Sequence, residues 1–401
     1  MNIFKKIYCR VFQTVFKIAI PILPYRNPVI LNSVQDIPKQ LKSKEISCVL
    51  LVTDKSIRQL GISTQLESLL KDNNIKCVIY DETVANPTVK NVEDARALYI
   101  KNNCRGIIGF GGGSPIDCAK IVGARVVRPN KSISQMKGIL KICKKLPLLM
   151  AVPSTAGTGS ETTLAAVITD GHKGHKFPIN DFSLIPHCAV LDPAVTKTLP
   201  PHLTATTGMD AITHAVEAYI GRSTVKSTRS DAIEAVKLID SNLEKAYNDG
   251  NNMEARSNML YASFLAGRAF SKSYVGYCHA VAHSLGGKYN IPHGLANAVL
   301  LPHVLKSYLP SKYACKKLKE LAIAINLVSK DTSDRAAAEA FINRLETMNK
   351  KMGITKKFDM IQKSDIPILA AYAEKEANPL YPVPILMTKE ELQQFYYAVM
   401  E

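Results

Sequence analysis

The pattern of hydrophobic and polar residues differs between the first and the second half of the chain. Between Cys48 and about Asp192, short apolar runs are separated by stretches with apolar residues at helical spacing. This order predicts strands alternating with helices, and therefore a parallel sheet with helices on both faces. The strands are expected at 48–53, 76–80, 106–110, 146–152, 165–169 and 188–191.

The pattern changes after Leu199-Pro200-Pro201. In the rest of the chain, alanine, glutamate, lysine and leucine dominate, and runs of β-branched residues are rare. Apolar residues at helical spacing predict helices at 232–247, 254–269 and 335–348. A chain of 401 residues suits two domains of roughly 150–200 residues. We therefore predict an α/β domain over 26–198 and an all-helical domain over 199–401.

The first 25 residues predict a separate, basic amphipathic helix. Its apolar face carries Phe4, Ile7, Val11, Val15, Ile18 and Ile22, and its polar face carries Lys6, Arg10, Gln13 and Lys17. Arg10 and Lys17 interrupt the apolar stretch, so a transmembrane span and a signal peptide are both disfavoured. Two interpretations stay open: the helix docks on the protein or a partner subunit, or residues 2–20 make peripheral contact with an anionic membrane surface.

Composition excludes some functions. The net charge is +17, but the lysines and arginines are spread along the chain, and tryptophan is absent. With no zinc-finger spacing, RNA-binding signature or long basic arm, we expect a solvated basic surface and no nucleic-acid partner. Nine cysteines without a CxxC pair indicate buried thiols in a reducing compartment, and so a cytoplasmic protein.

Two glycine-rich loops follow predicted strands. In 111–115, Gly-Gly-Gly-Ser-Pro, glycines would let the backbone approach a phosphate, Ser114 would cap the next helix, and Pro115 suits its first turn. The loop 153–161, Pro-Ser-Thr-Ala-Gly-Thr-Gly-Ser-Glu, is small and rich in hydroxyls. Each alone is also typical of an ordinary turn, but together they favour a dinucleotide site.

Asp54 comes directly after the first strand of this predicted sheet. A carboxylate there could accept from the adenosine ribose hydroxyls and repel a 2′-phosphate, which favours NAD over NADP. The alternative is a helix N-cap or a solvated turn residue.

Histidines cluster in the helical half of the chain. Asp210 and His214 lie four residues apart, as do His279 and His283, and His293 follows ten residues later. On a helix, residues four apart project from the same face. Each pair alone is ambiguous, but a metal explains the clustering of histidines among small and apolar neighbours. One carboxylate and three imidazoles suit Fe²⁺ or Zn²⁺ and leave room for a substrate oxygen.

Taken in order, these motifs resemble the iron-containing alcohol dehydrogenases. The resemblance covers residue 28 to the C-terminus and rests on four motifs: GGGS, PSTAGTGSE, GMDAITHAVE and HAVAHSLGGKYNIPHG, supported by Leu301-Pro302-His303-Val304 and Ala377-Asn378-Pro379. It implies an α/β dinucleotide-binding domain followed by an all-helical metal-binding domain, as in dehydroquinate synthase-like proteins, with cofactor and substrate meeting between them.

The resemblance also assigns residues. It implies that the metal ligands are Asp210, His214, His279 and His293, and that His283 transfers a proton. The implied cofactor contacts are Asp54, Gly112, Gly113, Ser114, Thr155 and Thr158. Lys176 matches a lysine near the cofactor ribose and the active site, and Phe270 matches an aromatic wall of the substrate pocket.

This sequence departs from the family near the expected pocket. Family members commonly have Ala-Phe-Ser-Asn-Ala-Gly-x-Gly, whereas residues 269–276 are Ala-Phe-Ser-Lys-Ser-Tyr-Val-Gly, and Ser284 replaces a frequent proline. The substrates of individual relatives therefore cannot be transferred to this chain.

The resulting hypothesis is a metal-dependent enzyme that moves a hydride between NAD(H) and a small alcohol or aldehyde, with Fe²⁺, or alternatively Zn²⁺, polarising the substrate oxygen. A homo-oligomer, most simply a dimer, is expected. The alternatives are a glycerol-type polyol dehydrogenase on the same scaffold, or a non-catalytic nucleotide- and metal-binding protein at a membrane surface.

Overall fold

The computed structural model describes residues 1–170 and 175–401, with only the backbone of Asp170 and His175. Contacts within the chain divide it into two compact units. One is continuous, from Pro24 to Leu199, and the other joins Met1–Leu23 to Pro200–Glu401. Among the described helices, none has the length and apolar character that a membrane span requires.

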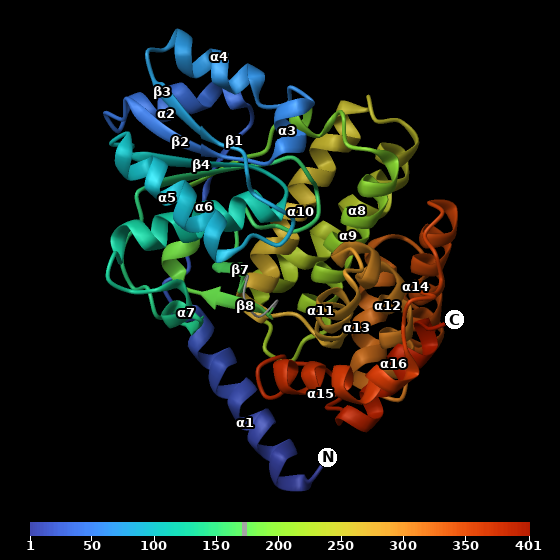
Figure 1. Cartoon of the computed structure of the whole chain (residues 1–401). Helices are drawn as coiled ribbons and strands as arrows, with labels where there is room; N and C mark the ends of the chain where they lie inside the picture. Colours follow the sequence, from blue (N-terminus) through green and yellow to red (C-terminus); the bar gives the residue numbers. More distant parts are fainter. Residues whose placement is uncertain (171–174) are drawn as a thin grey trace. The chain divides into compact units, whose positions relative to one another are not determined.

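The unit Pro24–Leu199 contains strands and helices in alternation (Figure 1). Its strands are β1 (Val29–Leu31), β2 (Cys48–Val52), β3 (Lys76–Tyr80), β4 (Gly106–Gly111), β5 (Gly138–Ile139), β6 (Leu148–Pro153), β7 (Ala165–Asp170), β8 (His175–Asn180) and β9 (Cys188–Val190). Its helices are α2 (Ile37–Lys42), α3 (Lys55–Gln59), α4 (Thr64–Asp72), α5 (Val89–Lys101), α6 (Gly113–Val127) and α7 (Ile133–Met136).

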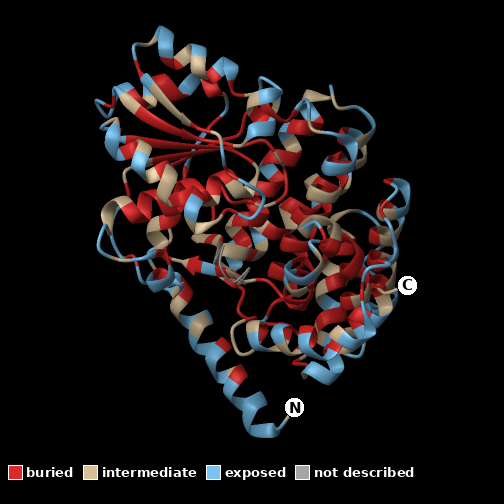
Figure 2. Cartoon of the chain, viewed as in Figure 1, coloured by how far each residue is buried: buried red, intermediate tan, exposed pale blue. Residues whose placement is uncertain are grey.

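Six strands form a parallel sheet in the order β1-β9-β6-β4-β2-β3, which confirms the predicted α/β architecture. Side chains of a strand alternate between the two faces of a sheet. Leu50 and Val52 accordingly pack with α5 and α6 on one face. Val49 and Leu51 pack with α2 and α4 on the other. Helices therefore cover both faces, and the sheet core is buried (Figure 2).

The segment Ala165–Asp170 is a strand, but it does not join the parallel sheet. It pairs antiparallel with β8, with Thr169 opposite Lys176, and β5 adds a third strand in parallel. Only four residues separate β7 from β8 along the chain. A parallel pair needs a crossover of about a dozen residues or more, so this short connection allows only the antiparallel arrangement.

The second unit is helical, as predicted for this half of the chain. Its helices are α1 (Ile3–Ala19), α8 (Pro201–Ile220), α9 (Lys226–Asn248), α10 (Met253–Ser273), α11 (Tyr277–Tyr289), α12 (His293–Ser307), α13 (Lys312–Ala324), α14 (Asp334–Lys351), α15 (Ile366–Ala377) and α16 (Lys389–Val399). Gly208 allows close packing here, because a Cβ at this position of α8 would collide with Leu243 of α9.

Candidate functional site

Three helices of the helical unit bring together four side chains that could hold a metal ion. Asp210 and His214 lie on one face of α8, His279 lies on α11, and His293 begins α12. One ligand atom from each of these residues falls within a group whose members all lie within 4.8 Å of one another.

The spacing of these atoms suits one ion. The Asp210 carboxylate lies 4.0 Å from His214 Nδ1, 3.8 Å from His279 Nε2 and 3.5 Å from His293 Nε2. Two ligands on one tetrahedral ion, each at roughly 2.1 Å, stand about 3.4 Å apart. The four residues of the sequence hypothesis therefore converge on a volume of the right size.

Burial and electrostatics favour a cation at this point. Asp210 and His279 are buried, and burial raises the pKa of Asp210. Burial, together with the neighbouring imidazoles, holds the pKa of His279 well below its usual range, so the ring is neutral, as a metal ligand must be. His279 Nε2 has no hydrogen-bond partner among the described residues. A buried nitrogen lone pair beside a buried carboxylate fits a divalent ion.

Glu217, one turn beyond His214 on α8, orients His279. Its Oε2 lies 2.6 Å from His279 Nδ1, and its two oxygens accept from the backbone N–H groups of Gly276 and Cys278 at 2.7 and 2.8 Å. An acceptor at Nδ1 places the ring proton there and leaves Nε2 to bind the metal. A Cβ at Gly276 would lie 2.6 Å from Glu217 Oε1, so this approach requires glycine.

Asn297 performs a similar role for the carboxylate. Its buried Nδ2 donates to Asp210 Oδ1 at 2.7 Å and lies 3.1 Å from His293 Nε2. Asn297 follows His293 by four residues on α12, as Glu217 follows Asp210 by seven on α8. Helical spacing could therefore have indicated both residues, although the sequence hypothesis gave neither a role.

His283 lies beside two of the candidate metal ligands, His279 and His293, and its Nδ1 contacts Glu376. Its ring stacks on that of His293 with centroids 5.1 Å apart, and its side chain is 40% exposed. Its Nδ1 lies 2.6 Å from Glu376 Oε1 of α15, which also accepts from the Tyr381 hydroxyl at 2.7 Å. No local pattern links Glu376 to His283, because 93 residues separate them.

The expected pocket wall also lies at the ligands. The Phe270 ring stacks on His214 at 4.1 Å between centroids. Tyr274, at the first of the two glycines in the family pattern, has φ 59° and ψ −175°. This backbone region is almost restricted to glycine and costs a bulky residue on the order of 1–3 kcal/mol. The ring of Phe16, 5.1 Å from that of Tyr274, belongs to α1 and helps to hold it.

The predicted cofactor residues meet at one edge of the parallel sheet. Asp54, the loop after Gly111 and the loop after Pro153 follow β2, β4 and β6, which are neighbours in the sheet. A Cβ at Gly113 would lie 3.1 Å from Thr158 Cγ2, and one at Gly112 would lie 3.7 Å from Thr155 Cγ2. Gly111 has φ +143°, which only glycine adopts readily. The glycines keep open a cradle of the kind that holds a pyrophosphate at a helix N-terminus.

The structure corrects one prediction for this group, the cap at Ser114, and gives Asp54 the N-cap position that the sequence left open as the alternative. Ser114 does not cap α6: the cap position is Gly112, α6 begins at Gly113, and Ser114 Oγ accepts from the backbone N–H of Asn86 at 3.2 Å. Asp54 is the N-cap of α3, accepting from Ile57 N–H at 3.0 Å through Oδ1. Lys176 lies on β8, half-buried, and burial lowers the pKa of its amine.

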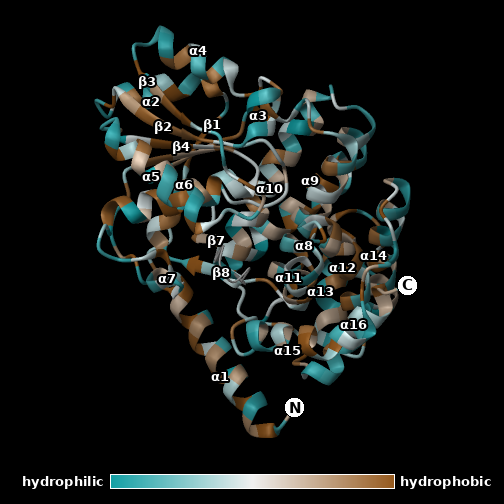
Figure 3. Ribbon diagram, viewed as in Figure 1, coloured by the Kyte–Doolittle hydropathy of each residue, from teal (hydrophilic) through white to brown (hydrophobic). Residues whose placement is uncertain are grey.

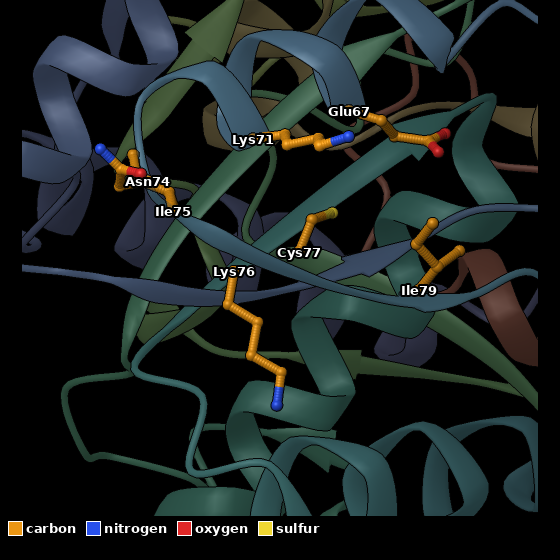
Figure 4. Close-up of a pocket in the computed structure, with 7 residues that line it drawn as sticks. All are labelled: Glu67, Lys71, Asn74, Ile75, Lys76, Cys77 and Ile79. Carbon is orange, nitrogen blue, oxygen red and sulfur yellow. The ribbon is translucent and has the colours of Figure 1, made fainter.

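A surface pocket of about 420 Å³ lies in another part of the α/β unit (Figure 4). It is lined by Glu67, Lys71, Asn74, Ile75, Lys76, Cys77 and Ile79, around α4 and β3. None of the predicted site residues contributes to it.

Comparison with known proteins agrees with this geometry. The family model described as "Iron-containing alcohol dehydrogenase" matches residues 29–193, and the model for the C-terminal part of the same family matches 204–400. The chain belongs to the iron-containing alcohol dehydrogenase family. It is therefore an oxidoreductase that acts on alcohols.

Individual relatives align with this chain over most of the length of both proteins. Alcohol dehydrogenase 4 of Saccharomyces cerevisiae is 35% identical over 90% of this chain and 93% of its own. The NAD-dependent methanol dehydrogenase of Bacillus methanolicus is 34% identical over 85% and 90%. The crystal structure of a 1,3-propanediol oxidoreductase superposes with a TM-score of 0.88 at 35% identity, covering 93% of this chain and 98% of that one.

Gly294 sets the approach of α12 to α8. A Cβ there would lie 2.5 Å from the backbone oxygen of Thr206 and 3.4 Å from Asp210 Cβ. Gly294→Ala should therefore push His293 away from Asp210 and weaken Zn²⁺ binding at least 10-fold in calorimetric titration. The control Gly287→Ala, on α11, meets nothing within 4 Å and should bind as the unsubstituted protein does. Equal affinity in the two variants would contradict this assignment.

Glu217→Gln tests the orientation of His279. An amide cannot accept from His279 and both backbone N–H groups together, so the metal affinity should fall by roughly 10- to 100-fold. Metal content after dialysis against a graded chelator measures this. Glu320→Gln is a matched control on the same unit, because Glu320 accepts from Tyr219 and Lys317 without touching the ligands. If both variants retain the metal equally, Glu217 has only a structural role.

Proposed function

We propose that this chain is an NAD-dependent alcohol dehydrogenase that interconverts a small primary alcohol and its aldehyde with Fe²⁺ at Asp210, His214, His279 and His293. The observation that carries the proposal is the convergence of these four ligand atoms within 4.8 Å. The family name supports iron, and the same donor set also suits Zn²⁺. When bound, the ion would act as a Lewis acid toward the substrate oxygen.

The protein residues around that point would bind, orient and move protons. Glu217 and Asn297 hold His279 and Asp210 in position. Phe270, stacked on His214, would pack against the substrate carbon chain. His283, exposed to solvent and in contact with Glu376, would exchange the alcohol proton with water, since an imidazole can both accept and donate a proton through its ring nitrogens.

The cofactor proposal rests on the sheet edge. Gly112, Gly113, Thr155 and Thr158 would hold the pyrophosphate and neighbouring groups, with Ser114 and Lys176 as further contacts. The Asp54 carboxylate would accept from the adenosine ribose and disfavour a 2′-phosphate, hence NAD over NADP. The printed name of the B. methanolicus relative, which includes NAD, supports this choice.

A small diol is a second candidate substrate, favoured by the structural similarity to a 1,3-propanediol oxidoreductase. We also propose a homodimer, since β1 lies at the edge of the parallel sheet with Val29 and Ile30 exposed for pairing. The nine free cysteines of the described chain favour a reducing compartment such as the cytoplasm.

Two histidine variants separate the metal ligand from the proton carrier. His279→Ala should lose the metal and turnover together, because three remaining ligands hold the ion weakly. His283→Ala should keep the metal and lose turnover on the order of 100-fold, most strongly at low pH in aldehyde reduction. Metal content and NADH oxidation with short aldehydes, in anaerobic protein, measure both effects.

His202→Ala, at an exposed histidine near the start of α8, is the control and should change neither property. A full metal complement with normal turnover in His279→Ala would refute the ligand assignment. Loss of metal in His283→Ala would show that this residue is a ligand.

Asp54→Asn tests the effect of the carboxylate charge at the proposed ribose site. Asparagine caps a helix as well as aspartate does, so α3 should be preserved while the carboxylate charge is removed. We expect kcat/KM with NADPH to rise relative to that with NADH by about 10-fold, roughly 1.4 kcal/mol of relieved repulsion. An unchanged ratio would mean that Asp54 is only a helix cap.

A further inference from the structure

Helix α1 is docked on the helical unit through Arg10 and Gln13 of its polar face, whereas Lys6 and Lys17 of that face are exposed. Cys9, Gln13 and Ile20 are buried, whereas the large apolar side chains of the opposite face are exposed. Exposure reaches 76% for Phe4, 71% for Ile18 and 84% for Ile22, which follows α1 in a short 3-10 turn. Most of α1 is accordingly exposed in Figure 2 and much of it hydrophobic in Figure 3.

The buried polar contacts fix this orientation. Arg10 donates to the backbone oxygens of Val383 and Pro384 at 2.8 and 2.9 Å. Gln13 Nε2 donates to the backbone oxygens of Pro379 and Tyr381 at 3.1 and 2.9 Å. Rotating α1 to bury its apolar face would leave these groups unsatisfied. The outward position of the apolar face is therefore part of the fold of this unit.

Phe16 adds a packing contact to these hydrogen bonds. Its ring lies 5.1 Å from that of Tyr274, the residue with the unfavourable backbone angles. The helix is thus held by contacts at three successive turns, through Arg10, Gln13 and Phe16. The helix is already folded in the free protein, so binding to a partner does not carry the entropic cost of folding it.

The exposed apolar residues of this segment form one continuous face along α1. Exposed apolar residues that stand singly are ordinary on a protein surface, whereas a contiguous group of this kind marks an interaction site. The face consists of Ile3, Phe4, Ile7, Tyr8, Val11, Phe12, Val15, Ile18 and Ile22.

The basic charge of the N-terminal segment indicates what the apolar face binds. Lys6 and Lys17 are exposed beside the apolar face, and no acidic residue precedes Asp36 in the sequence. A basic helix with an apolar face that includes aromatic residues suits the headgroup region of an anionic bilayer. A symmetric contact with a second copy would instead bring like charges together, with no carboxylate on the segment to compensate them.

We propose that α1 anchors the protein to the surface of an anionic membrane. The apolar face of α1 inserts among the lipid headgroups, and Lys6 and Lys17 contact lipid phosphates. Arg10 and Gln13 keep their bonds to residues 379–384. The enzyme is then a peripheral membrane protein, held there by one prefolded helix. This inference does not depend on the metal or the cofactor.

The test is sedimentation of the full chain with vesicles of phosphatidylglycerol and phosphatidylcholine, compared with phosphatidylcholine alone. We expect binding to the anionic vesicles and at least 10-fold weaker binding to neutral ones, because each lysine contributes roughly 5-fold near an anionic surface. No binding to the anionic vesicles would overturn the proposal.

A triple variant tests the apolar face. Ile7→Ser, Val15→Ser and Ile18→Ser together should reduce vesicle binding at least 100-fold, while thermal stability and dehydrogenase turnover stay unchanged, because these side chains are exposed. The matched control replaces Ile100, Leu327 and Met360, exposed apolar residues elsewhere, with serine, and should bind vesicles as the unsubstituted chain does.

Sedimentation velocity of the same proteins without lipid distinguishes a second copy as the occupant. We expect the same oligomeric state for the unsubstituted chain and the triple variant. If the triple variant dissociates an oligomer that the control retains, α1 is an interface between copies and the membrane proposal is wrong. Equal vesicle binding by the triple variant and the control would also overturn it.

Discussion

The buried carboxylate of Asp210 is the constraint around which the helical unit is arranged. An ionised carboxylate removed from water costs several kcal/mol unless a positive charge compensates it. Among the described residues, the ionisable partners of this carboxylate are the imidazoles of His214, His279 and His293, and none is a lysine or arginine. A divalent cation at the proposed site would supply the missing charge. The same four side chains are hard to explain as packing alone.

The residues around this cluster position the side chains of Asp210 and His279. Glu217 directs the Nε2 lone pair of His279 toward Asp210, and Asn297 holds the carboxylate from the other side. Gly276 and Gly294 lack a Cβ where one would collide with Glu217 or with α8. In the α/β unit, Gly112 and Gly113 similarly keep space beside Thr155 and Thr158. Small residues thus stand where a ligand or a charged group must come close.

Local spacing made much of this predictable. The i, i+4 pairs on α8 and α11 and the glycine loops after strands follow from helix and strand periodicity, which a sequence displays directly. Glu376 could not be found in this way, because its contact with His283 joins elements 93 residues apart. The antiparallel β7–β8 pair was missed because the sequence analysis expected no strand at His175–Asn180, where Lys176, Pro178 and Asn180 interrupt any apolar run.

The N-terminal helix shows a second limit of prediction from sequence. Its two faces were evident from the sequence, but not which face would be buried. Arg10 and Gln13 find backbone oxygens of residues 379–384, more than 360 positions away, and this outweighs the usual preference for burying the apolar face. Periodicity predicts that a helix is amphipathic; only tertiary contacts decide which way it faces.

The central claim is that one cation is held by three imidazoles and one carboxylate. X-ray absorption spectroscopy of the anaerobically loaded protein measures this directly, because imidazole rings give characteristic outer-shell scattering. The account predicts one bound ion per chain with three histidine nitrogens and at least one oxygen in its coordination sphere. An all-oxygen sphere, or one with fewer than two imidazoles, would contradict it.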